Sequence, residues 1–401
     1  MAKQIITSLL DTDLYKLTMQ QAVLQLFPKS AVTYRFKNRG DQRFNADFLQ
    51  KLQDQIFLMS SIQLTPEEYS WIKREIPFFK SLYIEYLKNY RFNPNEVMVS
   101  LGQDGDILLN IKGLWASTIL WEVPLMAIIS ELYFREIDTE WRPSDVEVEV
   151  RAGDKMRDLQ SAQCLYADFG TRRRRGFWVQ DDVVGVMARA QKNAHFPCFI
   201  GTSNVYFAMK YNIKPIGTMA HEWFMGMSVL EGLYNANYFA LENWVRVYHA
   251  DLGIALTDTY SFDAFLKDFK MEWAKIYDGV RHDSGNPCFF ADKIIEMYKG
   301  YGIDPLSKTI VFSDSLTTDK AIQIKAYCEG RIKVSFGIGT HFTNDFENSK
   351  ALNMVIKMWS CAASERHRQI PVVKLSDENG KVMGDPDAVK VAKWMFFGEK
   401  L

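Results

Sequence analysis

The feature that most constrains the fold of this chain is a pattern that recurs between residues 165 and 340. A short apolar run ends in a polar motif containing Gly or Asp, and a helical stretch follows. Strands that alternate with helices in this way form parallel βα units. A doubly wound open sheet gives similar spacing, but the pattern favours an α/β barrel. The seven expected strand-to-helix junctions are LYADFGTRRR (165–174), CFIGTSN (198–204), KPIGTMAHE (214–222), IALTDTY (254–260), GVRHDSGNP (279–287), TIVFSDSL (309–316) and KVSFGIGT (333–340).

The part of the chain before about residue 140 lacks this pattern. Apolar spacing predicts a helix over 14–26, and strands over 31–36 and 106–111. The stretch WRPSD (141–145) is a candidate boundary, because Pro143 disfavours helix in the residue before it. Near the other end, PVVKLSD followed by ENGKVMGDP predicts a hairpin that turns at Asn379 and Gly380.

Composition excludes some classes of protein. A length of 401 residues allows two or three domains, and 47% hydrophobic residues allow a large core. Lys and Arg number 48 against 49 Asp and Glu, for a formal net charge of -1. A general nucleic-acid binder needs a positive surplus, so any phosphate is expected to be bound locally in a basic pocket.

The cysteines and the apolar segments predict a cytoplasmic protein. The N-terminal stretch MAKQIITSLLDTD reaches acidic residues before any apolar run of signal-peptide length. The most apolar region, 114–134, is interrupted by Glu122, Pro124 and Glu131, so we expect a buried helix and no membrane span. The five cysteines are widely spaced and odd in number, which favours reduced thiols over disulfides or a zinc site: Cys164, Cys198, Cys288, Cys328 and Cys361.

Two motifs offer sites for anions. In VSFGIGTHF, Gly337 and Gly339 could let backbone N–H groups approach a phosphate, with a helix beginning near Thr340. A tight turn that needs glycine for its conformation is the alternative. In FGTRRRRGF, alternate arginines of 172–175 could face inward toward phosphate or carboxylate, and Phe169 could contact a flat ring. The alternatives are a solvated basic face or nucleic-acid patch for the arginines, and core packing for Phe169.

Other motifs concentrate titratable groups. His221 follows an expected strand end, and the neighbouring Glu222 could orient its imidazole. Arg281 and Asp283, two residues apart on a strand, would face the same side. With Asp258 and the segment 313–315 they make an oxygen-rich set that suits Mg²⁺ bound together with substrate phosphates, although each is equally suited to cap a helix.

Several common motifs are missing from the sequence. It contains no G-x-x-x-x-G-K-[ST], so ATP would not bind through a P-loop. It contains no G-x-G-x-x-G opening an N-terminal βαβ unit and no H-E-x-x-H, which argues against a Rossmann dehydrogenase and a zinc protease.

Taken together, the motifs resemble the bacterial type of the nicotinate phosphoribosyltransferase family. The resemblance runs in order from about residue 9 to residue 377. Ten elements in the right order are specific, although none is specific alone. They are LLDTDLYKLTMQQ, YRFKNR, ADFGTRRRR, GTSN, GTMAHEW, DTYSF, VRHDSGNP, FSDSL, SFGIGTHFTND and VVKLSD.

The resemblance implies the fold of the type II phosphoribosyltransferases. An N-terminal α/β domain over 1–140, completed by about 355–401, would pack on an irregular α/β barrel over 141–354. The implied enzyme is an ATP-coupled ligase and glycosyltransferase. It joins nicotinate to 5-phosphoribosyl-1-pyrophosphate, giving nicotinate mononucleotide and pyrophosphate in NAD salvage, with Mg²⁺ and a phosphohistidine.

The family's residue roles transfer onto matching positions. His221 matches the phosphorylated histidine, and Arg281 and Asp283 match a pair that contacts ribose and pyrophosphate. The substrate-binding set would be Tyr15, Phe169, Arg172, Ser203 and Asp258: Tyr15 and Phe169 on the pyridine ring, Arg172 near the phosphate and pyridine sites, Ser203 at the pyridine carboxylate, Asp258 at ribose or Mg²⁺. The 5′-phosphate cradle would be Gly337, Gly339 and Thr340.

The sequence leaves two other functions open. A related phosphoribosyltransferase that uses nicotinamide is the nearest, and a non-catalytic nucleic-acid-binding α/β protein is another. In related enzymes Tyr15 matches a residue given by a neighbouring subunit, which would require a homodimer; a monomer suffices if Tyr15 closes over its own site. The sequence does not say where ATP binds, which of Arg172–Arg175 faces the site, or which residue selects nicotinate.

Overall fold

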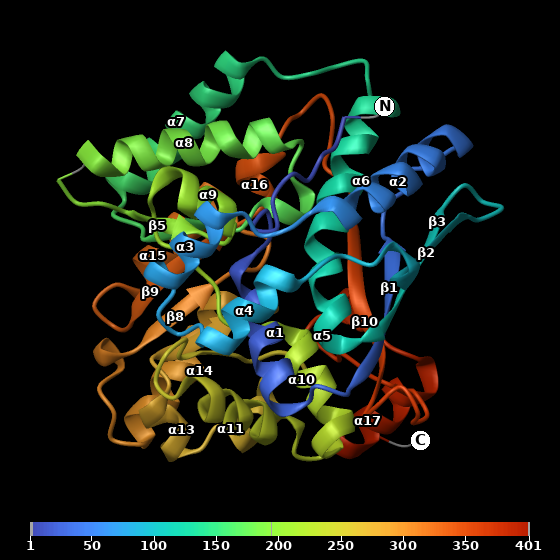
Figure 1. Cartoon of the computed structure of the whole chain (residues 1–401). Helices are drawn as coiled ribbons and strands as arrows, with labels where there is room; N and C mark the ends of the chain where they lie inside the picture. Colours follow the sequence, from blue (N-terminus) through green and yellow to red (C-terminus); the bar gives the residue numbers. More distant parts are fainter. Residues whose placement is uncertain (1–2, 194, 400–401) are drawn as a thin grey trace.

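The computed structural model describes residues 3–193 and 195–399, and within them the strands form two sheets (Figure 1). The first sheet of the described chain has five antiparallel strands in the order β11-β10-β1-β3-β2. The central strand, β1, comes from near the N-terminus and pairs with β10 from near the C-terminus, so this sheet joins the two ends of the chain. The strands are β1 (Ala31–Asn38), β2 (Val97–Leu101), β3 (Ile107–Leu114), β10 (Met354–Ala362) and β11 (Ile370–Pro371).

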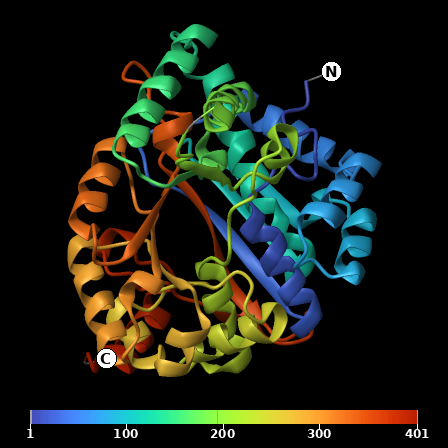
Figure 2. The same cartoon turned by 90° about the vertical axis from the view of Figure 1, so that its left-hand side faces the viewer.

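The second sheet is parallel, and its described part contains six strands in the order β5-β4-β9-β8-β7-β6. Helices follow the strands and lie around their outer side (Figure 2). The predicted α/β class with an irregular barrel is confirmed. The strands are β4 (Tyr166–Asp168), β5 (Phe199–Thr202), β6 (Ile254–Leu256), β7 (Gly279–His282), β8 (Thr309–Phe312) and β9 (Lys333–Ile338).

Six of the seven expected junctions follow a strand, but the one at 214–222 does not. This segment makes a single bridge to β5, where Pro215 faces Thr202, and proline has no N–H to extend a ladder. The Ile216 N–H donates to Thr202 O (2.8 Å), and the Thr218 hydroxyl donates to Ile254 O of β6 (3.1 Å). The segment therefore spans the two edge strands and makes the barrel irregular.

The helices of the first part agree with the sequence patterns. The predicted helix 14–26 is α1 (Leu14–Leu26), and the predicted strands are β1 and β3. The apolar run Trp115–Glu136 is long and apolar enough for a membrane span, but 89% of its most apolar window is buried inside the molecule, as expected of a core helix. It comprises α5 (Trp115–Thr118), a 3₁₀ turn, and α6 (Glu122–Glu136).

The expected hairpin near residue 380 is reduced to one antiparallel bridge between Lys374 and Met383, closed by a 3₁₀ turn over Asn379–Lys381. The predicted domain boundaries, near residues 140 and 355, stay a prediction. The remaining α-helices are α2 (Ala46–Leu58), α3 (Pro66–Glu75), α4 (Ser81–Asn89), α7 (Asp145–Ser161), α8 (Phe177–Asn193), α9 (Val205–Tyr211), α10 (His221–Met227), α11 (Ala236–Tyr248), α12 (Phe262–Asp268), α13 (Met271–Ile276), α14 (Pro287–Gly300), α15 (Thr318–Cys328), α16 (Thr340–Thr343) and α17 (Pro386–Phe397).

Candidate active site

A cavity of about 720 Å³ opens at the carboxyl ends of the parallel strands. Ligand sites of α/β barrels lie at this end, because the loops after the strands converge there. Asp258 lies behind the cavity wall and is 1% exposed. The other ten predicted site residues line the cavity: Tyr15, Phe169, Arg172, Ser203, His221, Arg281, Asp283, Gly337, Gly339 and Thr340.

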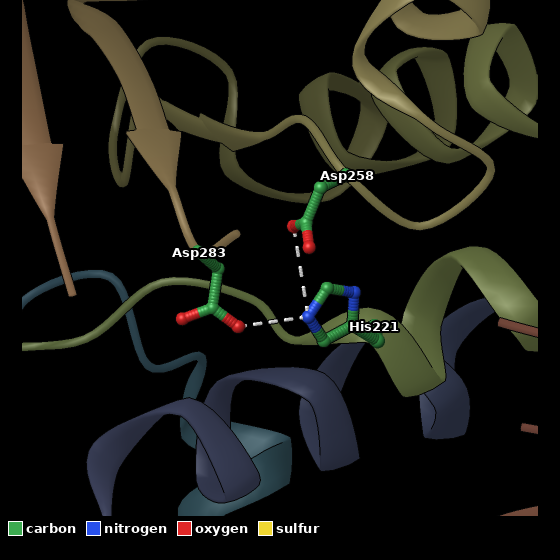
Figure 3. A group of neighbouring side chains, drawn as sticks. All are labelled: His221, Asp258 and Asp283. Carbon is green, nitrogen blue, oxygen red and sulfur yellow. Dashed lines mark hydrogen bonds and ion pairs between the residues drawn. The ribbon is translucent and has the colours of Figure 1, made fainter. Parts of the chain in front are cut away.

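His221 is the first residue of α10, and two aspartates from neighbouring strand ends face its ring (Figure 3). Asp283 follows β7, and its Oδ2 lies 3.0 Å from Nε2 of His221. Asp258 follows β6, and its Oδ1 lies 3.7 Å from the same nitrogen. The other ring nitrogen, Nδ1, lies 3.1 Å from the hydroxyl of Thr259. Nε2 is therefore the nitrogen directed toward the carboxylates.

A lysine completes this group. The ammonium of Lys374 lies 2.9 Å from Nε2 of His221 and 3.3 Å from Oδ2 of Asp258. Nε2 accepts a hydrogen bond from Lys374 in one tautomer and donates one to Asp283 in the other. Lys374 is 6% exposed, so its charge acts at short range with little screening by solvent.

These contacts set the charges of the group. Burial, and next the Lys374 ammonium, lower the pKa of His221 to about 4, so its imidazole is neutral at pH 7. Burial alone would raise the pKa of the Asp283 carboxyl, but Arg281 and His221 outweigh burial and bring it well below its usual value. Burial alone would also raise the pKa of the Asp258 carboxyl, but His221 and Lys374 outweigh burial and lower it below its usual value.

His221, Asp258 and Asp283 bring potential metal ligands within 4.8 Å of one another. The donor set does not fit Mg²⁺, which prefers oxygen ligands, and the Lys374 ammonium already supplies the cation. Carboxylate and hydroxyl oxygens at the cavity edge fit better. Ser313 donates to Oδ1 of Asp283 (2.8 Å), and Asp314 beside it also lines the cavity.

Glu222 does not orient His221, contrary to the sequence-based expectation. Its carboxylate turns away and accepts hydrogen bonds from Tyr34 (2.6 Å) and Trp115 (2.7 Å), and it forms an ion pair with Lys16. Successive residues at the start of a helix point about 100° apart, so adjacency in sequence did not bring the two side chains together.

The four arginines of 172–175 form two adjacent pairs with different surroundings, whereas the sequence predicted that alternate arginines would face inward. Residues 171–173 form a 3₁₀ turn instead of a strand, so Arg172 and Arg173 both line the cavity. Arg174 is fully buried and binds both carboxylate oxygens of Asp11 at 2.7 Å. Arg175 is buried, and its guanidinium lies 3.8 Å from the centre of the Phe134 ring. Two of the four arginines therefore lie at the cavity, and the other two are buried in the core.

Two aromatic residues and a hydroxyl lie at the same cavity. Tyr15 comes from the first turn of α1 of the same chain, and the Arg172 guanidinium lies 6.0 Å from its ring centre. Phe169 follows β4. The Ser203 hydroxyl donates to Asp13 (2.7 Å), which also lines the cavity. Flat apolar rings beside polar groups suit a small aromatic ligand.

Two glycines at the carboxyl end of β9, Gly337 within the strand and Gly339 just after it, leave little room for a side chain. An added Cβ at Gly337 would lie 2.3 Å from the Phe169 ring, and one at Gly339 would lie 3.1 Å from the Phe169 carbonyl oxygen. The missing side chain of Gly337 therefore leaves the space that the Phe169 ring occupies. The role of Gly337 in binding phosphate stays a prediction.

Several residues of the cavity were missed by sequence reasoning. Glu122 comes from α6, Lys357 from β10 and Lys374 from the segment after β11. Burial lowers the pKa of Lys357 to about 8. Lys374 stands in the motif VVKLSD, so its place in that motif was the one available signal. The others missed are Asp13, Arg39 and Lys381, whereas Arg173 and Asp314 lie in motifs that the sequence had already indicated.

Comparisons with known proteins agree with this geometry. Residues 164–399 match the nicotinate phosphoribosyltransferase family model, and residues 10–130 match the N-terminal domain model of that family. A nicotinate phosphoribosyltransferase of Methanosarcina mazei is 50% identical, with 98% of each chain covered. A crystal structure of nicotinate phosphoribosyltransferase from Porphyromonas gingivalis is 39% identical with a TM-score of 0.93, covering 97% of this chain and 99% of that one. A putative nicotinate phosphoribosyltransferase from Saccharomyces cerevisiae is 37% identical with a TM-score of 0.91, covering 98% of each chain.

Proposed function

Because the chain belongs to the nicotinate phosphoribosyltransferase family, we propose that it joins nicotinate to 5-phosphoribosyl-1-pyrophosphate. The products are nicotinate mononucleotide and pyrophosphate. The observation that supports this most is the single cavity at the strand ends, which brings together aromatic rings, arginines and carboxylates from both sheets. That set matches the chemistry of a flat acid and a polyphosphate.

The chemical step needs positioning and charge. The bond from ribose C1 to pyrophosphate breaks with oxocarbenium character, while the ring nitrogen of nicotinate forms the new bond to C1. Tyr15 and Phe169 hold the ring, and Arg172 and Lys357 are the cations available for its carboxylate. Arg281 lies 3.7 Å from Asp283, so the pair can bind pyrophosphate and ribose side by side.

The same cavity offers sites for the phosphates and the metal. Asp283, Ser313 and Asp314 would hold Mg²⁺ together with substrate oxygens. Bound there, the ion would neutralise charge on the leaving pyrophosphate. Gly339 and Thr340, at the start of α16, are proposed for the 5′-phosphate.

We also propose that ATP is coupled to the reaction through His221. Nε2 would attack the γ-phosphorus, forming an N–P bond while the bond to the bridging oxygen breaks and ADP leaves. A neutral imidazole has the free electron pair that this step needs, and Lys374 lies where its ammonium can neutralise the phosphoryl oxygens. Water later attacks the phosphorus, the N–P bond breaks and phosphate leaves. The phosphoryl group adds nearly two charges, which would bias nearby loops toward tight substrate binding.

The reaction would recover a pyridine acid for NAD synthesis in the cytoplasm. Tyr15 lines the cavity of its own chain, so a monomer can carry a complete site, and the homodimer stays a prediction.

The test is an assay of pyrophosphate release with 5-phosphoribosyl-1-pyrophosphate and Mg²⁺, with and without ATP. We expect turnover with nicotinate, stimulation by ATP, and a phosphohistidine that disappears in His221→Asn. Faster turnover with nicotinamide would favour the related enzyme. Salt-sensitive nucleic-acid binding without turnover would refute an enzyme, and ATP stimulation that survives in His221→Asn would refute the role of His221.

A further inference from the structure

Lys16, which has no role in the proposed reaction itself, lies at the centre of a buried charge network. Its side chain is fully buried, and its ammonium contacts Oε2 of Glu122 at 2.5 Å and Oε2 of Glu222. Both glutamates are about 5% exposed at the side chain. A buried charge is costly unless it is paired and hydrogen-bonded, so these positions are tightly determined.

The partners of the glutamates come from several elements. Glu222 also binds the Tyr34 hydroxyl of β1 and the Trp115 indole of α5. Glu122 lies at the cavity, where its Oε1 is 3.5 Å from Arg172 and 3.9 Å from Lys357. The network therefore runs from α10 through Lys16 to cations at the cavity surface.

The two ends of the network adjoin the functional residues. Lys16 follows Tyr15 on α1, and Glu222 follows His221 on α10. One ion pair thus joins the residue after the proposed ring-binding tyrosine to the residue after the proposed phosphorylated histidine.

A hydrogen bond and a close approach of the two backbones hold the segment before His221 against the start of α1. Thr18 donates its hydroxyl to Thr218 O (2.6 Å). A Cβ added to Gly217 would lie 3.0 Å from the backbone nitrogen of Tyr15, and the φ of +155° at Gly217 already disfavours other residues. A displacement of 217–222 would therefore move the first turn of α1 with it.

We propose that Lys16 is a positioning residue that transmits the phosphorylation state of His221 to the ring-binding residues Tyr15 and Arg172. The inference rests on the proposed function. A phosphoryl group on Nε2 would need room beside the carboxylates of Asp283 and Asp258, now 3.0 and 3.7 Å away. Lys374 can pair with the phosphoryl oxygens but does not create that room, so the start of α10 would be displaced. Glu222 would carry that displacement to Lys16, and Lys16 to Tyr15 and, through Glu122, to Arg172.

The experiment compares KM for nicotinate with and without ATP in the whole enzyme, and follows phosphohistidine formation by ³¹P NMR. Glu222→Gln is the main variant, because glutamine keeps an oxygen for Tyr34 and Trp115 but loses the charge that binds Lys16. Lys16→Met is the second, with thermal unfolding measured in parallel, since it removes the cation between two buried carboxylates. Lys308→Met is the matched control: its buried ammonium donates to Tyr277 O (2.6 Å) at the opposite end of β8 from the cavity.

In the wild type we expect ATP to lower KM by about tenfold, within the usual range of coupling between sites. In Glu222→Gln this ratio should fall to about twofold or less while phosphohistidine still forms, and Lys308→Met should keep the wild-type ratio. An unchanged ratio in folded Glu222→Gln would overturn the inference, and so would loss of phosphohistidine formation. A wild type without phosphohistidine or ATP effect would instead refute the ATP coupling proposed above, and the inference with it.

Discussion

The ammonium of Lys374 lies 2.9 Å from Nε2 of His221, although the two residues are 153 positions apart in the sequence. The contact joins the segment after the first sheet to the mouth of the barrel. It also explains how a histidine facing two aspartates keeps a lowered pKa, because burial and this cation together oppose protonation.

Replacing Lys374 should therefore change the pH dependence of His221. In Lys374→Met the aspartates act without the opposing cation, so the pKa of His221 should rise from about 4. The acid limb of phosphohistidine formation should move to higher pH, because a protonated ring cannot attack phosphorus. Rates measured from pH 5 to pH 8 check this, with Lys374→Arg as the control that keeps the charge. An acid limb at the same pH in both variants would contradict it.

His221 should also make stability depend on pH. Its pKa falls from 6.5 to about 4 on folding, so between these values the unfolded chain binds more protons. The stability is full above pH 6.5 and is lost as the pH falls toward 4. At pH 5 the loss should be about 2 kcal/mol relative to pH 7.5.

Urea unfolding of the wild type and His221→Asn at both pH values measures this loss. The variant should lack it, whereas the exposed His249→Asn should retain the wild-type dependence. Parallel curves for wild type and His221→Asn would show that His221 does not titrate in this way.

The division of the arginines predicts opposite effects of two adjacent substitutions. Arg174→Gln leaves the buried carboxylate of Asp11 without its cation and should lower the free energy of unfolding by about 3–5 kcal/mol. Arg172→Gln should leave the melting temperature nearly unchanged but lower kcat/KM by about 100-fold, because Arg172 faces the cavity. Thermal unfolding and steady-state kinetics on both variants test the division, which fails if Arg172→Gln proves the less stable of the two.

Gly337 should matter through Phe169. The Cβ of Gly337→Ala would meet the Phe169 ring at 2.3 Å, so the ring must move, at a cost of about 1–3 kcal/mol in stability. KM for nicotinate should rise more than KM for 5-phosphoribosyl-1-pyrophosphate, because the displaced ring binds the base. Gly153→Ala is the control: a Cβ there has no heavy atom within 4 Å, so alanine in α7 should stabilise by about 0.5–1 kcal/mol. A larger rise in KM for the phosphoribosyl donor would favour the phosphate role of Gly337 instead.

The sequence predicted most of the site residues that belong to a local polar motif. His221, Arg281 and Asp283 stand in short polar motifs that end apolar runs, and local pattern is enough to find them. Lys357 and Lys374 could not be found this way, since each is a single lysine among ordinary residues. Their place depends on the pairing of β10 with β1, which joins residues more than 300 positions apart.

Two predictions from local sequence were wrong for physical reasons. The expected strand at 214–222 contains Pro215, which cannot donate to a neighbouring strand. The alternate facing of the arginines assumed an extended chain after β4, whereas the chain turns there into a 3₁₀ helix. In both places the polarity pattern identified the site but not its backbone.

Lys357 should make the binding of nicotinate depend on pH. Burial lowers the pKa of its ammonium to about 8, and its nearest carboxylate oxygen, on Glu122, is 3.9 Å away, too far for a hydrogen bond. A cation in this state is available to a ligand carboxylate. Below pH 8 Lys357 is charged and should bind nicotinate fully; as the pH rises through 8 the charge is lost, so KM for nicotinate should increase. Lys357→Arg should move that increase to higher pH because arginine stays charged, and Lys357→Gln should give a high KM at every pH. If Lys357→Gln instead keeps the wild-type KM for nicotinate and loses affinity only for 5-phosphoribosyl-1-pyrophosphate, the lysine binds the phosphates, and Arg172 is left as the cation that selects the acid.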